Sequence, residues 1–180
     1  MNAKDLIYIA LFAALTAGLG TLPPFMLATL GVPITAQSMG PMLAGSILGA
    51  KRGTLALILF LLLAAMGLPV FAGARGGLSI FFGPGAGFVF GWPIAAFTIG
   101  FLFEYYWQRL NFIKAALCIG LGGVIICYVT GILWLNIMAK IPLMQAVVGS
   151  MLFLPGDLIK VILAANISLI IKRTYPLIKV

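Results

Sequence analysis

Long runs of apolar residues dominate this chain, and charged residues occur mainly between them. The charge-free stretches cover residues 6–50, 53–74, 76–103, 115–139 and 141–156. About 20 apolar residues suffice for a helix to cross the hydrocarbon core of a bilayer, and the first stretch has room for two crossings joined by a loop. The alternation of polar and apolar residues that marks a membrane β-barrel is missing. The pattern therefore predicts a helical membrane protein with several crossings.

Proline and glycine divide these runs into six predicted spans. In chain order, the spans cover residues 5–20, 36–50, 54–66, 85–103, 114–138 and 143–171. We expect Lys51, Arg52 and Gly53 to form a tight turn between the second and third spans. The predicted fold is therefore an all-α bundle of six transmembrane helices, with residues 1–180 as a single membrane domain.

The placement of basic residues predicts how the bundle is oriented. With the N-terminus inside, eight basic residues fall on the cytoplasmic side and two outside. The inner group is Lys4, Lys51, Arg52, Arg109, Lys114, Lys172, Arg173 and Lys179, and the outer group is Arg75 and Lys140. This distribution satisfies the positive-inside rule, and the inverted orientation would violate it. We therefore expect a multi-pass protein of the cytoplasmic membrane, with both termini in the cytoplasm.

Composition supports this class and argues against others. Hydrophobic residues make up 63% of the chain and charged residues 8%, which is too apolar for a soluble domain. The net charge of +8 does not indicate nucleic-acid binding, because the basic residues are scattered at span ends rather than gathered on one face. There is no histidine, and the only two cysteines, nine residues apart, face opposite sides of one predicted helix. We expect no catalytic residues, no metal site and no cofactor.

An acid and a base occur together inside an otherwise apolar segment. Of the three acidic residues, Asp5, Glu104 and Asp157, only Asp157 is remote from a span end, and Lys160 shares its helical face. Ionisable groups at such depth cost about 2.5–3.5 kcal/mol each and normally line a cavity or a pathway. The pair predicts a recognition element, with a carboxylate for N–H groups and an ammonium for a carbonyl. The alternative is that the two charges merely neutralise each other.

The outer loops and the first span hold the other candidates. Residues 67–85 form an apolar loop with six glycines and one arginine, which we interpret as a lid over the helix ends. Arg75 there has the geometry to hold a carboxylate, or alternatively to reach lipid phosphate. The further ligand-binding candidates are Ser79, Phe81 and Phe82 in the loop and Gln37 at the start of the second span. Two small-xxx-small pairs, Ala10/Ala14 and Ala13/Ala17, would allow close helix approach in the first span.

Two motifs together resemble the BioY family. They are the loop that begins Gly-Leu-Pro-Val-Phe-Ala-Gly-Ala-Arg at residue 67, and Leu-Pro-Gly-Asp-Leu-Ile-Lys over residues 154–160. Members are the substrate-binding (S) components of energy-coupling-factor (ECF) transporters for biotin. The resemblance implies a six-helix bundle that captures biotin from outside and reorients in the bilayer. It also implies two kinds of partner, a transmembrane coupling subunit and a pair of cytoplasmic ATPases that alone use ATP.

The resemblance also implies residue roles. Asp157 and Lys160 would bind the ligand, and the ureido ring of biotin, with two N–H donors and one carbonyl, is complementary to such a pair. The valerate carboxylate would be left to Arg75 or to solvent. The alanines of the first span match the motif by which S components dock on the coupling subunit, and either pair could serve.

Other functions remain open at this point. The chain could be an S component for another vitamin, although a thiamine or riboflavin site would favour more aromatic stacking. It could be a stand-alone secondary transporter with Asp157 as its proton site, or an intramembrane enzyme with Asp157 as acid or base.

Overall fold

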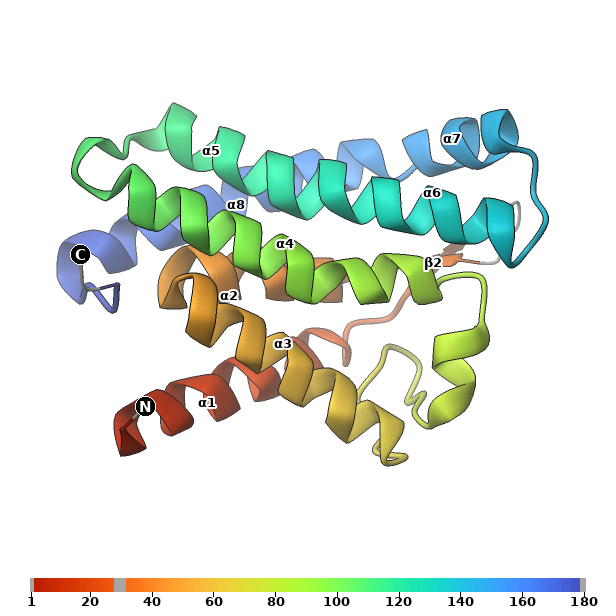
Figure 1. Cartoon of the computed structure of the whole chain (residues 1–180), viewed down its shortest axis with the longest axis horizontal. Coiled ribbons are helices and arrows are strands. Elements are labelled where there is room, and N and C mark those ends of the chain that lie inside the picture. Colours follow the sequence, from red (N-terminus) through yellow and green to blue (C-terminus); the bar gives the residue numbers. More distant parts are fainter. Residues whose placement is uncertain (1, 28–31, 179–180) are drawn as a thin grey trace.

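The predicted apolar spans form helices that pack side by side along one direction (Figure 1). The computed structural model describes residues 2–27 and 32–178. Within these residues the α-helices are α1 Ala3–Leu19, α2 Met39–Leu48, α3 Ala50–Ala65, α4 Ala86–Tyr105, α5 Phe112–Gly120, α6 Cys127–Ile137, α7 Leu143–Met151 and α8 Leu154–Thr174. Two short strands, β1 Phe25–Leu27 and β2 Val32–Ile34, pair antiparallel. The all-helical prediction is thus confirmed, apart from this hairpin.

In the part of the chain that the structure describes, three helices are long and apolar enough to cross a membrane by themselves. They are α4, α8 and the continuous helical segment Phe112–Ile137, in which a π-helical stretch at Leu121–Ile126 joins α5 to α6. In that stretch Gly122 and Gly123 allow close packing, because an added Cβ would lie 2.4 Å from a side-chain atom of Ile99 and 2.7 Å from Met42 respectively. The segment predicted as the sixth span consists of two helices, α7 and α8, separated at Leu152 and Phe153.

The turn predicted at residues 51–53 is wrong, because these residues belong to the first turn of α3. The chain reverses one step earlier, at Gly49, whose φ of +84° suits a residue without a Cβ. An added Cβ there would lie 2.3 Å from the Glu104 carboxylate. Glu104 instead accepts a hydrogen bond of 2.8 Å from the Ala50 amide. The acid on α4 therefore caps the start of α3.

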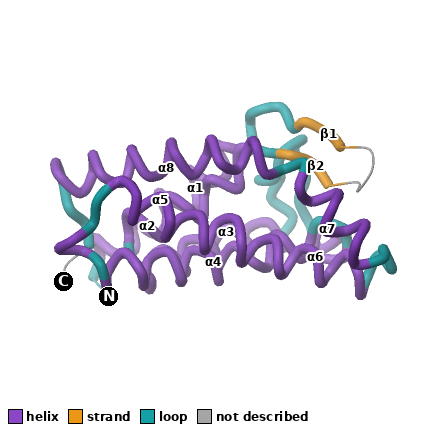
Figure 2. Tube along the Cα trace, turned by 90° about the horizontal axis from the view of Figure 1, so that it is seen from above, coloured by secondary structure: helices purple, strands orange, loops and turns teal. Residues whose placement is uncertain are grey.

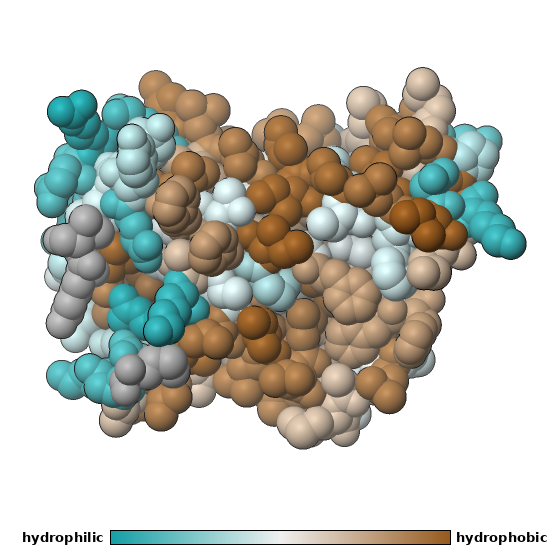
Figure 3. Space-filling view, in the orientation of Figure 1, coloured by the Kyte–Doolittle hydropathy of each residue, from teal (hydrophilic) through white to brown (hydrophobic). Residues whose placement is uncertain are grey.

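Helix α4 lies at the centre of the packing and contacts α2, α3 and α6. Large side chains of α4 and its neighbours, such as Phe60, Phe103, Met42 and Ile99, are fully buried. The outward faces are also apolar, as Figure 3 shows for one side of the molecule, where hydrophilic residues gather mainly at one end. Exposed residues such as Leu117 and Ile113, both 67% exposed, fit contact with lipid rather than water.

The described ends of the chain lie together, at the end of the bundle remote from the β-hairpin (Figure 1). There Arg52 pairs with Asp5 across 3.3 Å and donates to the Leu177 carbonyl. The Lys172 ammonium lies 5.0 Å from the centre of the Trp107 ring. Figure 2 shows the hairpin and nearby loops at the opposite end. Lys179, assigned to the inner basic group, lies outside the described residues.

Candidate ligand-binding site

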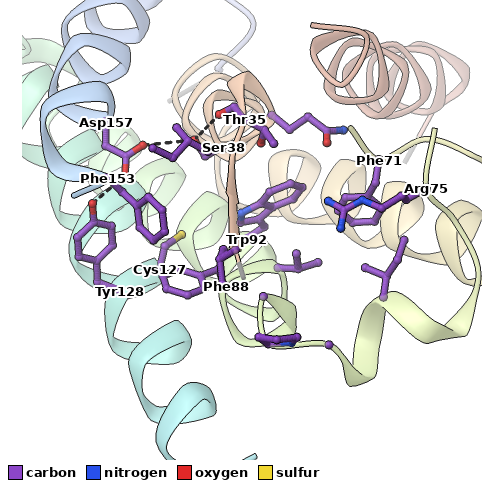
Figure 4. Close-up of a pocket in the computed structure, with 18 of the residues that line it drawn as sticks. Thr35, Ser38, Phe71, Arg75, Phe88, Trp92, Cys127, Tyr128, Phe153 and Asp157 are labelled. Atoms are coloured by element: carbon purple, nitrogen blue, oxygen red, sulfur yellow. Dashed lines mark hydrogen bonds between the residues drawn. The ribbon is translucent and has the colours of Figure 1, made fainter. Parts of the chain in front are cut away.

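A cavity of about 460 Å³ lies between the α3–α4 loop (residues 66–85) and the ends of several helices. Figure 4 shows Asp157 and Tyr128 on one side of the cavity, and Phe71 and Arg75 on the other. The polar side chains that line it are Thr35, Gln37, Ser38, Arg75, Ser79, Tyr128, Asp157 and Lys160. The structure therefore brings five of the residues predicted from sequence, Gln37, Arg75, Ser79, Asp157 and Lys160, to one cavity.

The ion pair inferred from sequence spacing is present at this cavity. The Lys160 ammonium lies 2.9 Å from Oδ1 of Asp157, and the two side chains are 14% and 8% exposed. Pro155 suits the first turn of α8 because it has no N–H to satisfy there. Asp157 also belongs to that first turn, where the helix dipole favours a negative charge. The local sequence thus places a stabilised carboxylate at the buried start of α8.

Two further residues, Ser38 and Tyr128, bond to this ion pair, and neither is among the ligand-binding residues predicted from sequence. The Lys160 ammonium donates to Ser38 Oγ at 2.8 Å, and Ser38 Oγ lies 3.4 Å from Oδ1 of Asp157. The Tyr128 hydroxyl donates to Oδ2 of Asp157 at 2.9 Å (Figure 4). In the sequence, Ser38 is simply a polar residue beside Gln37 in an apolar segment. Nothing in the sequence distinguishes Tyr128 from an aromatic residue that packs in a helix.

This charge cluster, made of Ser38, Tyr128, Asp157 and Lys160, retains hydrogen-bonding capacity for a ligand. A carboxylate has about four acceptor positions, and Asp157 uses three of them for Lys160, Ser38 and Tyr128. An ammonium has three donors, and Lys160 uses two within the cluster. One acceptor position and one donor therefore remain within the cluster, which suits a ligand with N–H and C=O groups.

Aromatic side chains form the apolar walls. Phe71 and Trp92 pack with ring centres 5.8 Å apart, and both contact the buried Phe60. Phe88 meets Phe153 edge to face at 5.9 Å, and Tyr128 at 6.3 Å. Aromatic pairs of this kind are favourable contacts, and here they form the wall of the cavity. A preformed apolar pocket with a few converging polar groups is the usual form of a small-molecule site.

Arg75 and Ser79 lie at the exposed edge of the cavity. The Arg75 Nε–H donates to the Ala72 carbonyl at 3.0 Å, and a backbone bridge pairs Arg75 with Phe71. Among the described residues, no carboxylate pairs with Arg75. Its guanidinium therefore remains available to an anionic group at the cavity edge.

Three predicted residues have surroundings that differ from those of a ligand contact. Phe81 and Phe82 do not line the cavity, because the 3-10 turn Leu78–Phe82 directs them elsewhere. Phe82 is 80% exposed, and Phe81 stacks on Phe90 with ring centres 5.7 Å apart. Gln37 does line the cavity, but its amide is bonded to the protein backbone on both its nitrogen and its oxygen.

The alanines of α1 are divided between two faces. Ala10 and Ala14 are exposed, Ala13 is buried and Ala17 is partly buried. Only the Ala10/Ala14 pair therefore lies on a surface open to another helix. No group of three or more metal-ligating side chains occurs in the part of the chain that the structure describes.

The fold and the cavity together define a helical membrane protein with a cavity suited to a small ligand at one end of the bundle. The model of the BioY family matches residues 1–177, and the chain belongs to this family. The expected resemblance is thereby confirmed. The family is one of transporters, so the chain is not an enzyme.

Similar proteins cover nearly the whole chain. The biotin transporter BioY of Rhizobium etli is 45% identical over 186 residues, which cover 99% of this chain and 98% of the relative. The biotin transporter BioY of Rhodobacter capsulatus is 44% identical, with 96% and 95% covered. A crystal structure of the S-component for biotin from an ECF-type ABC transporter is 35% identical, with a TM-score of 0.93 over 98% of this chain and 97% of that one.

Proposed function

We propose that this chain is the S component of an ECF transporter and captures biotin from outside the cell for uptake across the cytoplasmic membrane. The observation that carries the proposal is the charge cluster, a buried Asp157–Lys160 pair bonded to Ser38 and Tyr128 in an aromatic cavity. Membership of the BioY family supports biotin as the ligand, as do the names of its relatives.

The charge cluster suits the ureido ring of biotin. Asp157 accepts a ring N–H and Lys160 donates to the ring carbonyl, through the capacity that each retains. The sulfur ring and the aliphatic chain then lie against the aromatic walls that include Phe71, Trp92 and Phe153. At the cavity edge Arg75 binds the ligand carboxylate, or the carboxylate stays in solvent. We leave Phe81 and Phe82 out of the proposed site.

The proposed topology has six crossings with both termini in the cytoplasm. The crossings are α1, α2, α3, α4, the joined α5–α6 segment and α8, while α7 is a short helix at the outer end. Arg52 pairs with Asp5, near the N-terminus, and with the Leu177 carbonyl, near the C-terminus. These contacts support placing both termini and inner basic residues at the same end of the bundle. In this orientation the cavity opens outward. Residues 1–180 act as one membrane domain.

The proposed partners are a transmembrane coupling subunit and two cytoplasmic ATPases, which bind and hydrolyse the ATP. This chain itself uses no cofactor. Docking on the coupling subunit uses the exposed face of α1 that carries Ala10 and Ala14, because small residues let two helices approach closely. The buried Ala13 supports the helix from inside.

Isothermal titration of biotin into the detergent-purified chain tests the function. We expect tight one-to-one binding that Asp157→Asn weakens at least tenfold, since truncation of one partner in a buried charged pair costs about 2–5 kcal/mol. Absence of binding by a folded sample would contradict the proposal. The alternatives would then be titrated in turn: other vitamins, or proton-driven uptake into vesicles without ATPases.

A further inference from the structure

Gln37 is the most deeply buried polar residue beside the cavity, with 1% of its surface exposed. Its Nε2 donates to the Thr16 carbonyl of α1 at 3.1 Å and to the Val70 carbonyl at 2.8 Å. Its Oε1 accepts from the Ala72 amide at 2.9 Å. Both N–H donors of the side chain are therefore used within the protein, and none is left for a ligand.

These three bonds join the α3–α4 loop to α1. Val70 and Ala72 flank Phe71, a buried residue of the cavity wall that packs on Trp92. The Phe71 backbone is bonded in turn to Arg75, through N–O distances of 3.0 and 3.2 Å. Gln37 therefore bonds to the backbone on both sides of Phe71, and the backbone of Arg75 bonds to that of Phe71 itself. The wall of the cavity is held in place at Phe71.

The surroundings of Gln37 are adapted to its amide. Gly20, at the end of α1, has an ordinary helical φ of −76°, so its backbone does not require glycine. A Cβ added there would lie 2.6 Å from Nε2 and 2.8 Å from Cδ of Gln37. The absence of a side chain at residue 20 thus leaves the space that the amide occupies.

We propose that Gln37 is a positioning residue that fastens the α3–α4 loop to α1 and thereby slows the release of bound ligand. The inference rests on the proposed function for the identity of the ligand, though not for the fastening itself. Without the amide, the buried Ala72 N–H loses its partner, and an unsatisfied buried N–H is costly. Water can reach that N–H only when the loop separates from α1, so the open state gains population.

Two variants remove the fastening in different ways. Gln37→Met keeps an unbranched side chain of similar length and removes all three hydrogen bonds. Gly20→Ala retains Gln37 but displaces its amide. The matched control is Gly18→Ala on the same helix, because an added Cβ at Gly18 meets nothing within 4 Å.

Two measurements on the purified chain test the proposal. Hydrogen–deuterium exchange of the segment 70–72 without ligand should be at least tenfold faster in Gln37→Met and Gly20→Ala than in the wild type. The dissociation rate of labelled biotin should rise at least tenfold, while its association rate constant stays within about threefold. Gly18→Ala should match the wild type in both measurements.

Each other outcome contradicts a specific part of the reasoning. Unchanged exchange in both variants would show that Gln37 does not hold the loop, and faster dissociation with unchanged exchange would make it a ligand contact. Faster exchange with normal dissociation would show that the loop does not retain the ligand. If the wild type did not bind biotin, the proposed function would fail, while the exchange data would still decide whether Gln37 fastens the loop.

Discussion

Replacement of Lys160 by methionine separates the structural role of the ion pair from its role in binding. Methionine keeps much of the length of the side chain and removes the charge. The buried Asp157 would then retain Ser38 and Tyr128 but lose its cationic partner, 2.9 Å away. Loss of one partner of a buried ion pair typically destabilises a protein by about 3–5 kcal/mol. Because two hydroxyl partners remain, we expect the lower end, about 3 kcal/mol.

Thermal unfolding of the purified protein in detergent measures this cost. For a chain of this size, a loss of about 3 kcal/mol corresponds to a fall in Tm of roughly 6–12 °C. The double variant Asp157→Asn/Lys160→Met has no buried charge at this position, and it should recover most of the lost stability. Neither variant should bind biotin tightly. Lys51→Met is the control, because Lys51 is exposed on α3 and should tolerate the change.

Two results would refute this reasoning. Wild-type stability of Lys160→Met would mean that the fold does not depend on pairing the Asp157 carboxylate with the ammonium. Equal instability of the single and double variants would assign the loss to packing around residue 160 rather than to an unpaired charge.

Three further predictions test separate parts of the structure. Tyr128→Phe removes one hydrogen bond to the Asp157 carboxylate, worth about 1.5–3 kcal/mol to the folded protein, and the less firmly held carboxylate should bind biotin more weakly in a titration, whereas unchanged affinity would remove Tyr128 from the site. Ala14→Leu should leave biotin binding intact but abolish co-purification with the coupling subunit, and a normal yield of complex would exclude this face of α1. Gly49→Ala should lower Tm by several degrees, because it forces a Cβ toward the Glu104 carboxylate at a φ of +84°, and an unchanged melting curve would contradict that account.

The helical architecture could be predicted from sequence because every long apolar run has few other ways to satisfy its backbone in lipid. The same reasoning placed Asp157 and Lys160 correctly on one face of a helix, since three residues is a fixed helical spacing. It failed at local detail. The turn before α3 depends on a single glycine at residue 49, while the charged residues at 51 and 52 gave a misleading signal.

The rest of the site depends on contacts between distant segments. Tyr128 and Asp157 are 29 positions apart in the sequence, and Ser38 and Lys160 are 122 positions apart, so no local sequence pattern predicts either contact. For Phe81 and Phe82, sequence identified a loop near the site but not which way each ring points. A 3-10 turn changes that direction at every residue, and the turn was not predicted.

The short 3-10 turn Ala36–Ser38 connects the charge cluster to the loop that encloses the cavity. Ser38 bonds Lys160 on one side, and the adjacent Gln37 bonds Val70 and Ala72 on the other. A ligand that takes the remaining positions on Asp157 and Lys160 acts directly on the partners of Ser38. Since one peptide bond separates Ser38 from Gln37, a shift of that turn also moves the group that fastens the loop. We therefore expect substitutions in this turn to affect both ligand binding and the attachment of the loop.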